Sequence, residues 1–201
     1  MRRLISLLSL SLALVFASLS PAFAGPKLET AIFAGGCFWS MQHDLAPIPG
    51  VVSTEVGYSG GRVAHPTYEQ VSSETTGHLE SVRVTFDPTK LTYAALVEHY
   101  WRWIDPTDAG GAFCDRGASY HSAIFVASPD QRRVAEASLA TINTRFKGHV
   151  ATEIRAAGPF WLAEDYHQHY ADKNPAYYAR YRVGCGKDAA IRQIWGADAF
   201  R

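Results

Sequence analysis

Alternating and helically spaced apolar residues divide most of the chain into short strands and helices. Short apolar runs and period-two alternation predict strands over residues 29–34, 51–58, 79–86, 120–126 and 150–156. Apolar residues three and four positions apart predict helices over residues 37–45, 92–103 and 129–146. From residue 158 onward the chain is aromatic and irregular, and only short helical pieces are expected.

Residues typical of helix starts support these assignments. Thr92 and Ser128 are suitable N-cap residues, and Pro129 suits a first helical turn. The order strand, helix, strand, strand, helix, strand is compatible with a ferredoxin-like split unit. We therefore predict a single α+β domain, a two-layer sandwich in which helices cover one face of a mixed sheet. An irregular C-terminal tail follows it.

The first residues have the pattern of a secretory signal peptide. A basic start precedes an apolar run over residues 4–16, and Ala22 and Ala24 occupy the small-residue positions of a cleavage site. The run is shorter than the roughly 20 residues of a spanning helix, although an uncleaved membrane anchor is the alternative. We predict a signal peptide over residues 1–24 and a domain over residues 25–201. The mature protein is expected in the periplasm or outside the cell, without stable membrane insertion.

Composition excludes several classes of protein. Hydrophobic residues make up 47% of the 201 residues and charged residues 19%, which argues against a disordered chain. The 19 basic and 19 acidic side chains give a net charge of zero, so a surface that binds nucleic acid through charge is not expected. Three cysteines are too few for a disulfide scaffold, and their odd number leaves at least one thiol unpaired. We expect a monomer.

Cys37 is the first candidate for a reactive side chain. It follows two glycines that end a predicted strand, and a predicted helix begins at it. The free N–H groups and the positive dipole end of a helix start stabilise a thiolate, which lowers the thiol pKa and favours nucleophilic attack. Phe38 and Trp39 add an apolar surface beside the sulfur. A buried structural cysteine is the alternative interpretation.

Glu80 is conspicuous because of its place in an alternating pattern. Positions 80, 82, 84 and 86 hold Glu, Val, Val and Phe, whereas the residues between them are polar. Glu80 therefore belongs to the core-facing side of a strand. Burial raises the pKa of a carboxyl group and lets it keep its proton near neutral pH. Glu80 is a candidate proton donor, unless it lies at the strand end and pairs with a basic group.

Other polar residues offer hydrogen bonds or a second thiol. The phenols of Tyr68 and Tyr120 can donate a hydrogen bond without carrying charge. Asp115 is a turn or ion-pair residue by default. Cys185 lies between two glycines in a segment expected to be mobile, where it can approach another sulfur or remain an inert thiol. The chain lacks the Cys-x-x-Cys and His-Glu-x-x-His patterns, so no metal is expected.

These residues lie in motifs that resemble the A-type peptide methionine sulfoxide reductases. The resemblance spans roughly residues 30–170 and is specific, because seven blocks occur in the same order and spacing. The blocks are Gly35-Gly36-Cys37-Phe38-Trp39, Val56-Gly57-Tyr58-Ser59-Gly60-Gly61, Pro66-Thr67-Tyr68, Thr76-Gly77-His78-Leu79-Glu80, Asp105-Pro106-Thr107, Asp115-x-Gly117-x-x-Tyr120-x-Ser122-Ala123-Ile124-Phe125, and Phe160-Trp161-x-Ala163-Glu164-x-x-His167-Gln168.

The resemblance implies a role for each matched residue. Cys37 looks like the nucleophile that attacks the sulfoxide sulfur, and Glu80 looks like the acid that protonates the sulfoxide oxygen. The set that hydrogen-bonds around this oxygen would be Tyr68, Asp115 and Tyr120. The apolar wall that receives the substrate methyl group would be Phe38 and Trp39.

The resemblance also implies a redox cycle and a substrate. Cys37 would be left as a sulfenic acid, which a second thiol converts to a disulfide. An external dithiol, such as a thioredoxin-like protein, would then reduce the enzyme by exchange. The family acts on the S epimer of methionine sulfoxide, free or in peptides, and needs no metal or organic cofactor.

The chain departs from the family pattern mainly in its cysteines. The tail lacks the paired-cysteine, glycine-rich ending of many members and offers only Cys185, which we infer to be the resolving cysteine. Cys114, which is less usual in the family, is the alternative. Smaller departures at Ser40, Ile104 and His121 fall outside the matched catalytic positions.

Two other functions are compatible with these residues. A thiol peroxidase would use Cys37 and Cys185 to consume peroxide and would leave sulfoxides unchanged. A binding module for oxidised-methionine segments would keep Cys37 as a structural residue only. The combination of a helix-start cysteine with Glu80 on a buried face favours catalysis. We therefore predict an exported reductase that repairs oxidised methionine in proteins.

Overall fold

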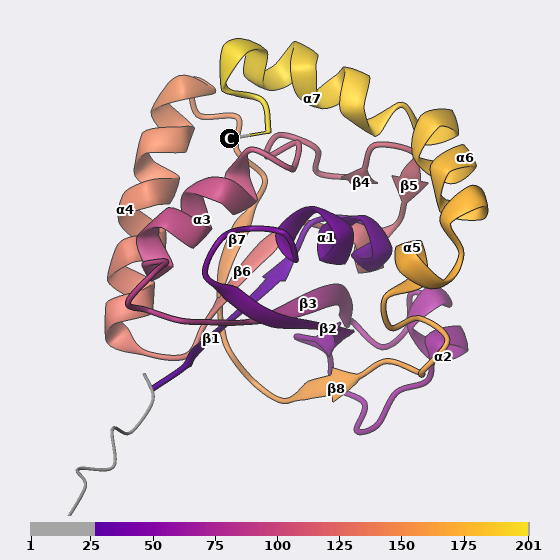
Figure 1. The fold of residues 1–201 in the computed structure, drawn as a ribbon. Helices are drawn as coiled ribbons and strands as arrows, with labels where there is room; N and C mark the ends of the chain where they lie inside the picture. The colour runs from indigo at the N-terminus through magenta and orange to yellow at the C-terminus, as the bar shows by residue number, and fades with distance from the viewer. Residues whose placement is uncertain (1–26, 201) are drawn as a thin grey trace, which may run out of the picture.

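Six strands form the sheet at the centre of the computed structural model, which describes residues 27–200 (Figure 1). The strands are β1 (Glu29–Ala34), β2 (Val51–Ser59), β3 (Leu79–Phe86), β6 (Ala123–Val126), β7 (Glu153–Ala156) and β8 (Phe160–Leu162). They lie in the order β7-β6-β1-β3-β2-β8, and all neighbours run antiparallel except β6 and β7. The predicted signal peptide lies outside the described residues.

The four central strands have a ferredoxin-like arrangement. The chain passes from β1 through α1 (Phe38–Leu45) to β2, and from β3 through α3 (Tyr93–Trp101) to β6. Each of these crossovers leaves one antiparallel strand between its two ends, so the central order is β6-β1-β3-β2. This order confirms the predicted α+β class and the split βαβ unit. β7 and β8 extend the unit at its two edges.

Helices and the sheet enclose one main hydrophobic core. Helix α4 (Pro129–Arg145) packs beside α3, and α1 packs against β2 and β3. Fully enclosed core side chains from both layers include Phe33, Met41, Leu45, Val82, Phe86, Leu96, Tyr100 and Trp101. On the other side of β3, Arg83 is half-exposed and its guanidinium donates to Glu55 of β2 at 2.7 Å.

The predicted helix starts agree with the structure. Thr92 Oγ1 accepts a hydrogen bond from the backbone N–H of Ala95 at 3.1 Å. Ser128 Oγ accepts one from Gln131 N–H at 3.1 Å, with Pro129 in the first turn of α4. These side chains satisfy donors that the helix itself leaves free, so the two helices begin where local sequence chemistry places them.

The C-terminal part is more regular than the sequence indicates. It contains α5 (Tyr170–Lys173), α6 (Pro175–Cys185) and α7 (Lys187–Trp195), which Figure 1 shows as a chain of helices around one side of the molecule. Ile191 and Trp195 are one helical turn apart and are both buried, and Trp195 Nε1 donates to the carbonyl of Ile104. The tail is therefore held by tertiary packing, which local periodicity does not reveal.

Two predicted strands begin later than expected. Tyr120 lies in a 3₁₀ turn (Ala118–Tyr120), and β6 starts only at Ala123. The turn is formed because the Glu74 carboxylate accepts hydrogen bonds from the backbone N–H and hydroxyl of Ser119, at 2.8 and 2.7 Å. β7 likewise begins at Glu153 rather than at position 150.

A buried ionic cluster joins α6 and α7 to α1. The carboxylate of Asp44 accepts from Arg182 Nη1 at 2.7 Å and from Lys187 Nζ at 2.8 Å. Arg182 also donates to Asp188. The side chains of Asp44 and Lys187 are only 1% and 5% exposed, so removal of one partner would leave an uncompensated buried charge. The cluster fixes the position of α6 above α1.

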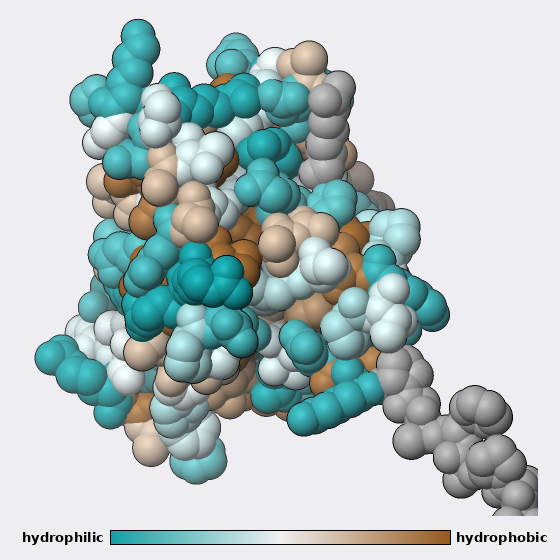
Figure 2. All heavy atoms as spheres, turned by 90° about the vertical axis from the view of Figure 1, so that its left-hand side faces the viewer, coloured by the Kyte–Doolittle hydropathy of each residue, from teal (hydrophilic) through white to brown (hydrophobic). Residues whose placement is uncertain are grey.

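The outer face of α4 is polar. Figure 2 shows hydrophilic residues spread over this side of the molecule, with hydrophobic atoms visible mainly in recesses between them. Only Ala135 and Ile142 of this helix are buried. Within residues 27–200, no helix combines the length and the hydropathy needed to cross a membrane.

Candidate active site

Cys37 lies at the junction between β1 and α1. Its backbone is the N-cap of α1, and its carbonyl accepts hydrogen bonds from Ser40 and Met41. Gly36 makes this turn with φ +93°, and a Cβ there would lie 2.6 Å from the Cβ of Ala112. Glycine is therefore required at this position by both backbone conformation and space. The chain delivers the sulfur to the start of the helix, as predicted.

The prediction of a lowered thiol pKa is wrong for this state of the protein. Cys37 is the one free cysteine of the described part and keeps partial exposure. Burial of its thiol raises the pKa most, and the negative charges of Glu80 and Asp115 raise it further. Hydrogen bonds from the Tyr181 hydroxyl and the Trp39 backbone act in the opposite direction and are outweighed. Burial and nearby negative charge therefore change the thiol pKa more than the helix start does.

Glu80 lies on the buried face of β3, as the alternation predicts. It is 3% exposed, and its Oε2 accepts a hydrogen bond from the backbone N–H of Phe38 at 2.9 Å. Burial raises the pKa of Glu80 to about 8, with Asp115 and Glu74 adding repulsion and the Phe38 bond opposing the change. The carboxyl therefore carries a proton at neutral pH and can donate it. This hydrogen bond joins Glu80 to Phe38, the residue next to Cys37.

The structure brings Tyr68 and Tyr120 together with Cys37 and Glu80. Burial raises the pKa of each phenol most, and the proximity of Glu80 and Cys37 raises it further. Tyr68 begins α2 (Tyr68–Ser72), and its backbone N–H donates to Glu164 at 2.9 Å. Two phenolic donors thus lie beside the buried acid.

Asp115 belongs to the same group of side chains. It lies in β5 (Asp115–Arg116), which forms a short hairpin with β4 (Gly111–Ala112). Its Oδ2 accepts a hydrogen bond of 2.6 Å from the hydroxyl of Tyr181 in α6. Burial raises the pKa of Asp115, while Tyr181 and Lys187 oppose that change. Asp115 is therefore a positioned acceptor rather than a turn residue.

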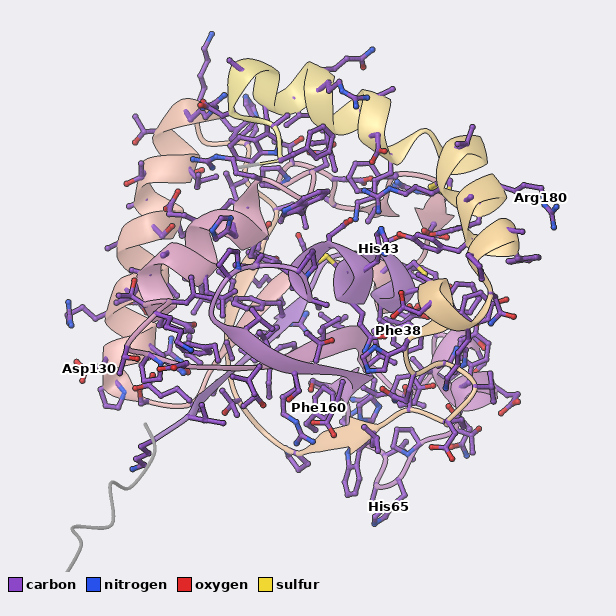
Figure 3. All side chains as sticks on the ribbon, in the orientation of Figure 1. Phe38, His43, His65, Asp130, Phe160 and Arg180 are labelled. Atoms are coloured by element: carbon purple, nitrogen blue, oxygen red, sulfur yellow. A yellow bond between two sulfur atoms is a disulfide. The ribbon has the colours of Figure 1, made fainter. Side chains whose placement is uncertain are left out.

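Phe38 and Trp39 have different environments. Phe38, labelled on α1 in Figure 3, is 1% exposed and its ring packs on Tyr58 and His167. Trp39 is partly exposed, stacks on Tyr170 at a centroid distance of 3.7 Å, and donates from Nε1 to His167 Nδ1 at 2.9 Å. Trp39 thus keeps a partly exposed apolar surface at the start of α1, whereas Phe38 belongs to the core.

The two remaining cysteines are bonded to each other. Cys114, directly before β5, and Cys185, the last residue of α6, form a disulfide with a Cα separation of 5.0 Å. The sequence predicted that Cys185, or alternatively Cys114, pairs with Cys37, whereas the structure pairs these two cysteines with each other. This pairing is possible because α6 folds back over the β4–β5 hairpin. The sulfurs and the carboxylate of Asp115 lie within 4.8 Å of one another, but the disulfide occupies the two thiol ligands of any metal.

Four residues of the site were not predicted from the sequence. Glu164 and His167 lie inside a matched motif, where each could have been assigned a positioning role. Glu74 carries no signal in the sequence that points to its bonds with Ser119. Tyr181 lies in the tail outside every matched block, and only the folding of α6 brings it to Cys37 and Asp115.

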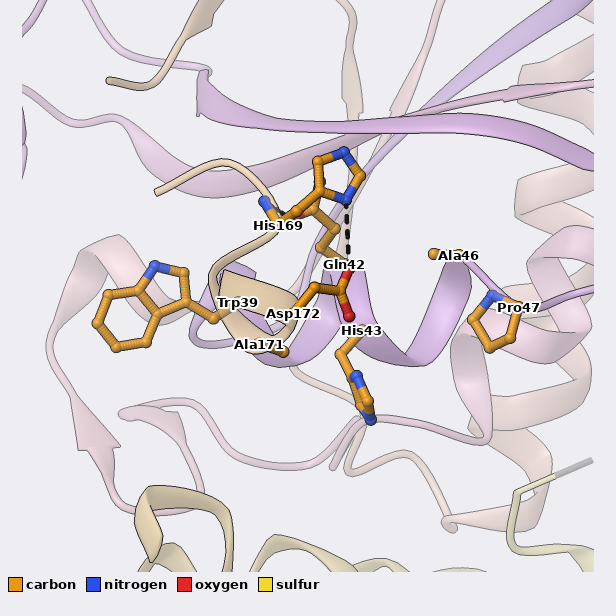
Figure 4. Close-up of a pocket in the computed structure, with 8 residues that line it drawn as sticks. All are labelled: Trp39, Gln42, His43, Ala46, Pro47, His169, Ala171 and Asp172. Carbon is orange, nitrogen blue, oxygen red and sulfur yellow. Dashed lines mark hydrogen bonds and ion pairs between the residues drawn. The ribbon is translucent and has the colours of Figure 1, made fainter. Parts of the chain in front are cut away.

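A pocket of about 330 Å³ opens beside Trp39, on the outer side of α1 (Figure 4). It is lined by Trp39, Gln42, His43, Ala46, Pro47, His169, Ala171 and Asp172. Trp39 belongs to both this pocket and the cysteine site, but none of the lining residues is a cysteine or a buried carboxyl group. The pocket can hold a neighbouring group of a bound molecule, whereas the reactive atoms lie at Cys37.

A free thiol at Cys37, together with a disulfide directly beside Asp115 of the same site, is the arrangement of a thiol-dependent oxidoreductase, here on a ferredoxin-like sheet. Residues 29–199 match the family model described as peptide methionine sulfoxide reductase. The chain therefore belongs to the peptide methionine sulfoxide reductase family, in its A type, and it is an oxidoreductase that reduces methionine sulfoxide.

Individual relatives support the assignment. Peptide methionine sulfoxide reductase MsrA 2 of Caulobacter vibrioides is 54% identical over 197 residues, which cover 98% of this chain and all of that protein. Methionine sulfoxide reductase A of Corynebacterium diphtheriae is a solved structure with TM-score 0.67 and 34% identity, covering 75% of this chain and 76% of the other. Reduced Mxr1 from Saccharomyces cerevisiae has TM-score 0.71 and 28% identity, covering 75% and 87%.

Proposed function

We propose that Cys37 reduces the S epimer of methionine sulfoxide, free or in peptides and proteins, and that Glu80 is the proton donor. The observation that carries the proposal is the buried Glu80 carboxyl, which keeps its proton up to a pH of about 8 and is bonded to the backbone of Phe38 beside Cys37. An acid that stays protonated at neutral pH suits the protonation of a weakly basic sulfoxide oxygen.

The reaction proceeds by attack of the Cys37 sulfur on the sulfoxide sulfur. Glu80 transfers its proton to the sulfoxide oxygen, which makes the sulfur more electrophilic, and Tyr68, Tyr120 and Asp115 hold the oxygen in place. The oxygen is transferred to Cys37, methionine leaves, and Cys37 becomes a sulfenic acid. The proton lost by the thiol restores Glu80. The apolar wall of Phe38 and the partly exposed Trp39 accepts the S-methyl group.

The other two cysteines complete the redox cycle. The Cys185 thiol attacks the Cys37 sulfenic acid, which forms a Cys37–Cys185 disulfide and releases water. The Cys114 thiol then displaces Cys37, which forms the Cys114–Cys185 disulfide and restores the Cys37 thiol. The pairing of Cys114 with Cys185 supports a cycle that ends in this disulfide, because it corresponds to the product of the exchange that restores Cys37.

An external dithiol is the proposed electron donor, and a thioredoxin-like protein is the class that suits disulfide exchange. Yeast Mxr1 has also been solved in complex with Trx2, although its likeness to this chain, at 20% identity and TM-score 0.52, is one of fold alone. We propose that the enzyme uses only its own side chains and requires no metal or organic cofactor.

An epimer-resolved assay tests the proposed reaction. Reduced protein is incubated with a peptide that contains racemic methionine sulfoxide and with dithiothreitol, and the two epimers are separated by chiral chromatography. We expect loss of the S epimer only. Loss of the R epimer would contradict the proposal. Rapid consumption of hydrogen peroxide with no loss of either epimer would instead favour a thiol peroxidase, and binding without turnover would favour a binding module.

We further propose that the enzyme acts outside the cytoplasm on oxidised proteins. The basic start, apolar run and Ala-x-Ala pattern of residues 1–24 support this location. Expression of the full chain in a Gram-negative host should yield a periplasmic protein that begins at Gly25, as measured by intact mass after osmotic shock. A cytoplasmic protein that retains residues 1–24 would contradict the proposal.

A further inference from the structure

We propose that Tyr181 closes the sulfoxide site while the Cys114–Cys185 disulfide is intact, so that substrate enters only after this disulfide is reduced. The inference rests on the proposed function, in which the sulfoxide sulfur must reach Cys37. It assigns control of substrate access to Tyr181, a residue that lies outside the matched motifs.

The Tyr181 side chain occupies the approach to Cys37. Its hydroxyl donates its one proton to Asp115 Oδ2 at 2.6 Å and lies close enough to the Cys37 sulfur to influence the pKa of that thiol. Its ring stands edge-on to the indole of Trp39, with centroids 6.2 Å apart and an interplanar angle of 81°. Tyr181 therefore bridges the nucleophile and the proposed methyl-binding surface, and a bound sulfoxide would have to displace it.

The disulfide ties together both partners of the Tyr181–Asp115 hydrogen bond. Tyr181 and Cys185 are four residues apart on α6, so their side chains lie on the same face of the helix. Cys114 directly precedes Asp115 in the chain. The covalent link between Cys114 and Cys185, reinforced by a 3.2 Å bond from Cys114 N–H to Cys185 Sγ, holds the two elements together at this point.

The other anchors of α6 lie on a different element. Arg182 bonds to Asp44, and the Tyr178 hydroxyl lies 3.4 Å from Ser40 Oγ, so both anchors join α6 to α1. They are independent of the disulfide. The β4–β5 hairpin, by contrast, has two residues in each strand. Reduction is therefore expected to let the hairpin, with Asp115, move away from α6 while α6 stays on α1. The Tyr181 side chain then loses its acceptor and can rotate away from Cys37.

We call the closure of the site by Tyr181 in the disulfide form the gate. The gate sets the order of the steps in the catalytic cycle. A dithiol donates two electrons and two protons, the Cys114–Cys185 bond breaks, two thiols form, and the donor becomes a disulfide. Tyr181 is then free to leave Cys37 and admit a sulfoxide. Because both resolving thiols are present at that moment, the sulfenic acid formed on Cys37 never lacks a partner. Closure would thus protect Cys37 from oxidation beyond the sulfenic acid.

A single-turnover experiment without reductant tests the gate. Protein with the Cys114–Cys185 disulfide and free Cys37, verified by mass after alkylation, is compared with fully reduced, desalted protein. Each is mixed with excess S-epimer peptide, and methionine is measured by rapid quench. The first turnover needs only Cys37, so both forms can produce a first methionine. The reduced form regenerates the Cys37 thiol as Cys114–Cys185 forms, so its first turnover is read from the initial phase. We expect the disulfide form to be at least about 100-fold slower.

Variants separate the gate from general effects on the site. Tyr181→Ala in the disulfide form, and Cys114→Ser, which cannot form the disulfide, should each react within about threefold of the reduced protein. Tyr181→Phe keeps the ring but loses the hydrogen bond to Asp115 through which the disulfide holds it, so its rate should fall between those of the wild-type disulfide form and Tyr181→Ala. Arg180→Ala is the matched control, because this exposed neighbour on α6 points away from the body of the protein in Figure 3, and it should keep the full difference. The rate at which iodoacetamide alkylates Cys37 gives a readout independent of turnover and should follow the same pattern.

The outcomes distinguish failure of the gate from failure of the proposed reaction. Equal first-turnover rates for the disulfide and reduced forms would overturn the gate and leave the reductase mechanism intact. A disulfide form of Tyr181→Ala that stays slow in both turnover and alkylation would overturn the role of Tyr181. Absence of methionine from every form, including reduced protein, would contradict the proposed function itself.

Discussion

Cys37→Ser is expected to lower the rate of methionine formation by at least about 10⁴-fold, which is the scale seen when a catalytic nucleophile is removed. A serine hydroxyl is a far weaker nucleophile than a thiol, and it cannot take up the sulfoxide oxygen as a sulfenic acid. The measurement is the steady-state rate with the S-epimer peptide and dithiothreitol, together with the yield of methionine in a single turnover.

The single-turnover yield also supplies the control for this substitution. Cys185→Ser lacks the proposed resolving thiol but retains Cys37, so it should still form about one methionine per chain in the first turnover. The Cys37→Ser protein should form none, although its circular dichroism spectrum and unfolding midpoint match those of the parent. A Cys37→Ser protein that keeps its first turnover would exclude Cys37 as the nucleophile.

Glu80→Gln is expected to reduce kcat/KM by about 10²- to 10⁴-fold, because the amide cannot deliver a proton to the sulfoxide oxygen. The pH profile provides a second test. The pKa of Glu80 is raised to about 8 by burial, so the protonated and active form predominates below that pH. The kcat/KM of the wild-type enzyme should fall as the pH rises through about 8, and the residual activity of Glu80→Gln should lack this decline.

Burial of Glu80 also predicts the sign of a stability change with pH. The unfolded carboxyl ionises near its ordinary value of 4.5, whereas the folded one keeps its proton to about 8. The unfolded state therefore binds fewer protons between these values, and stability should fall as the pH rises through that window. Glu80→Gln should remove this contribution. A wild-type urea midpoint that rises across the same window, with Glu80→Gln unchanged, would contradict the assigned pKa.

Glu55→Gln is the matched control for Glu80→Gln. Glu55 lies on the neighbouring strand β2, but it is half-exposed and pairs with Arg83 on the other side of the sheet. We expect its kcat/KM to stay within about twofold of wild type, since exposed ion pairs contribute little. If both variants lost activity equally, the effect of Glu80→Gln would reflect general damage to the sheet rather than loss of an acid.

Local chemistry in the sequence determined much of the fold and part of the site. The polar and apolar alternation of β3 was enough to place Glu80 toward the core, because adjacent residues of a strand face opposite sides. The side-chain caps at Thr92 and Ser128 located two helix starts, since a cap depends on residues only three positions apart. The two glycines before Cys37 predicted that a helix begins there.

Only the tertiary structure decided the electrostatic state of Cys37 and its relation to the tail. The helix start alone predicts a lowered thiol pKa, but burial and the charges of Glu80 and Asp115 reverse the direction. Cys114 and Cys185 are 71 positions apart, and Tyr181 and Asp115 are 66 positions apart. Their meeting depends on α6 folding over the hairpin. Periodicity reports which side of an element is apolar, whereas burial, charge and disulfide pairing depend on what other elements bring to the same place.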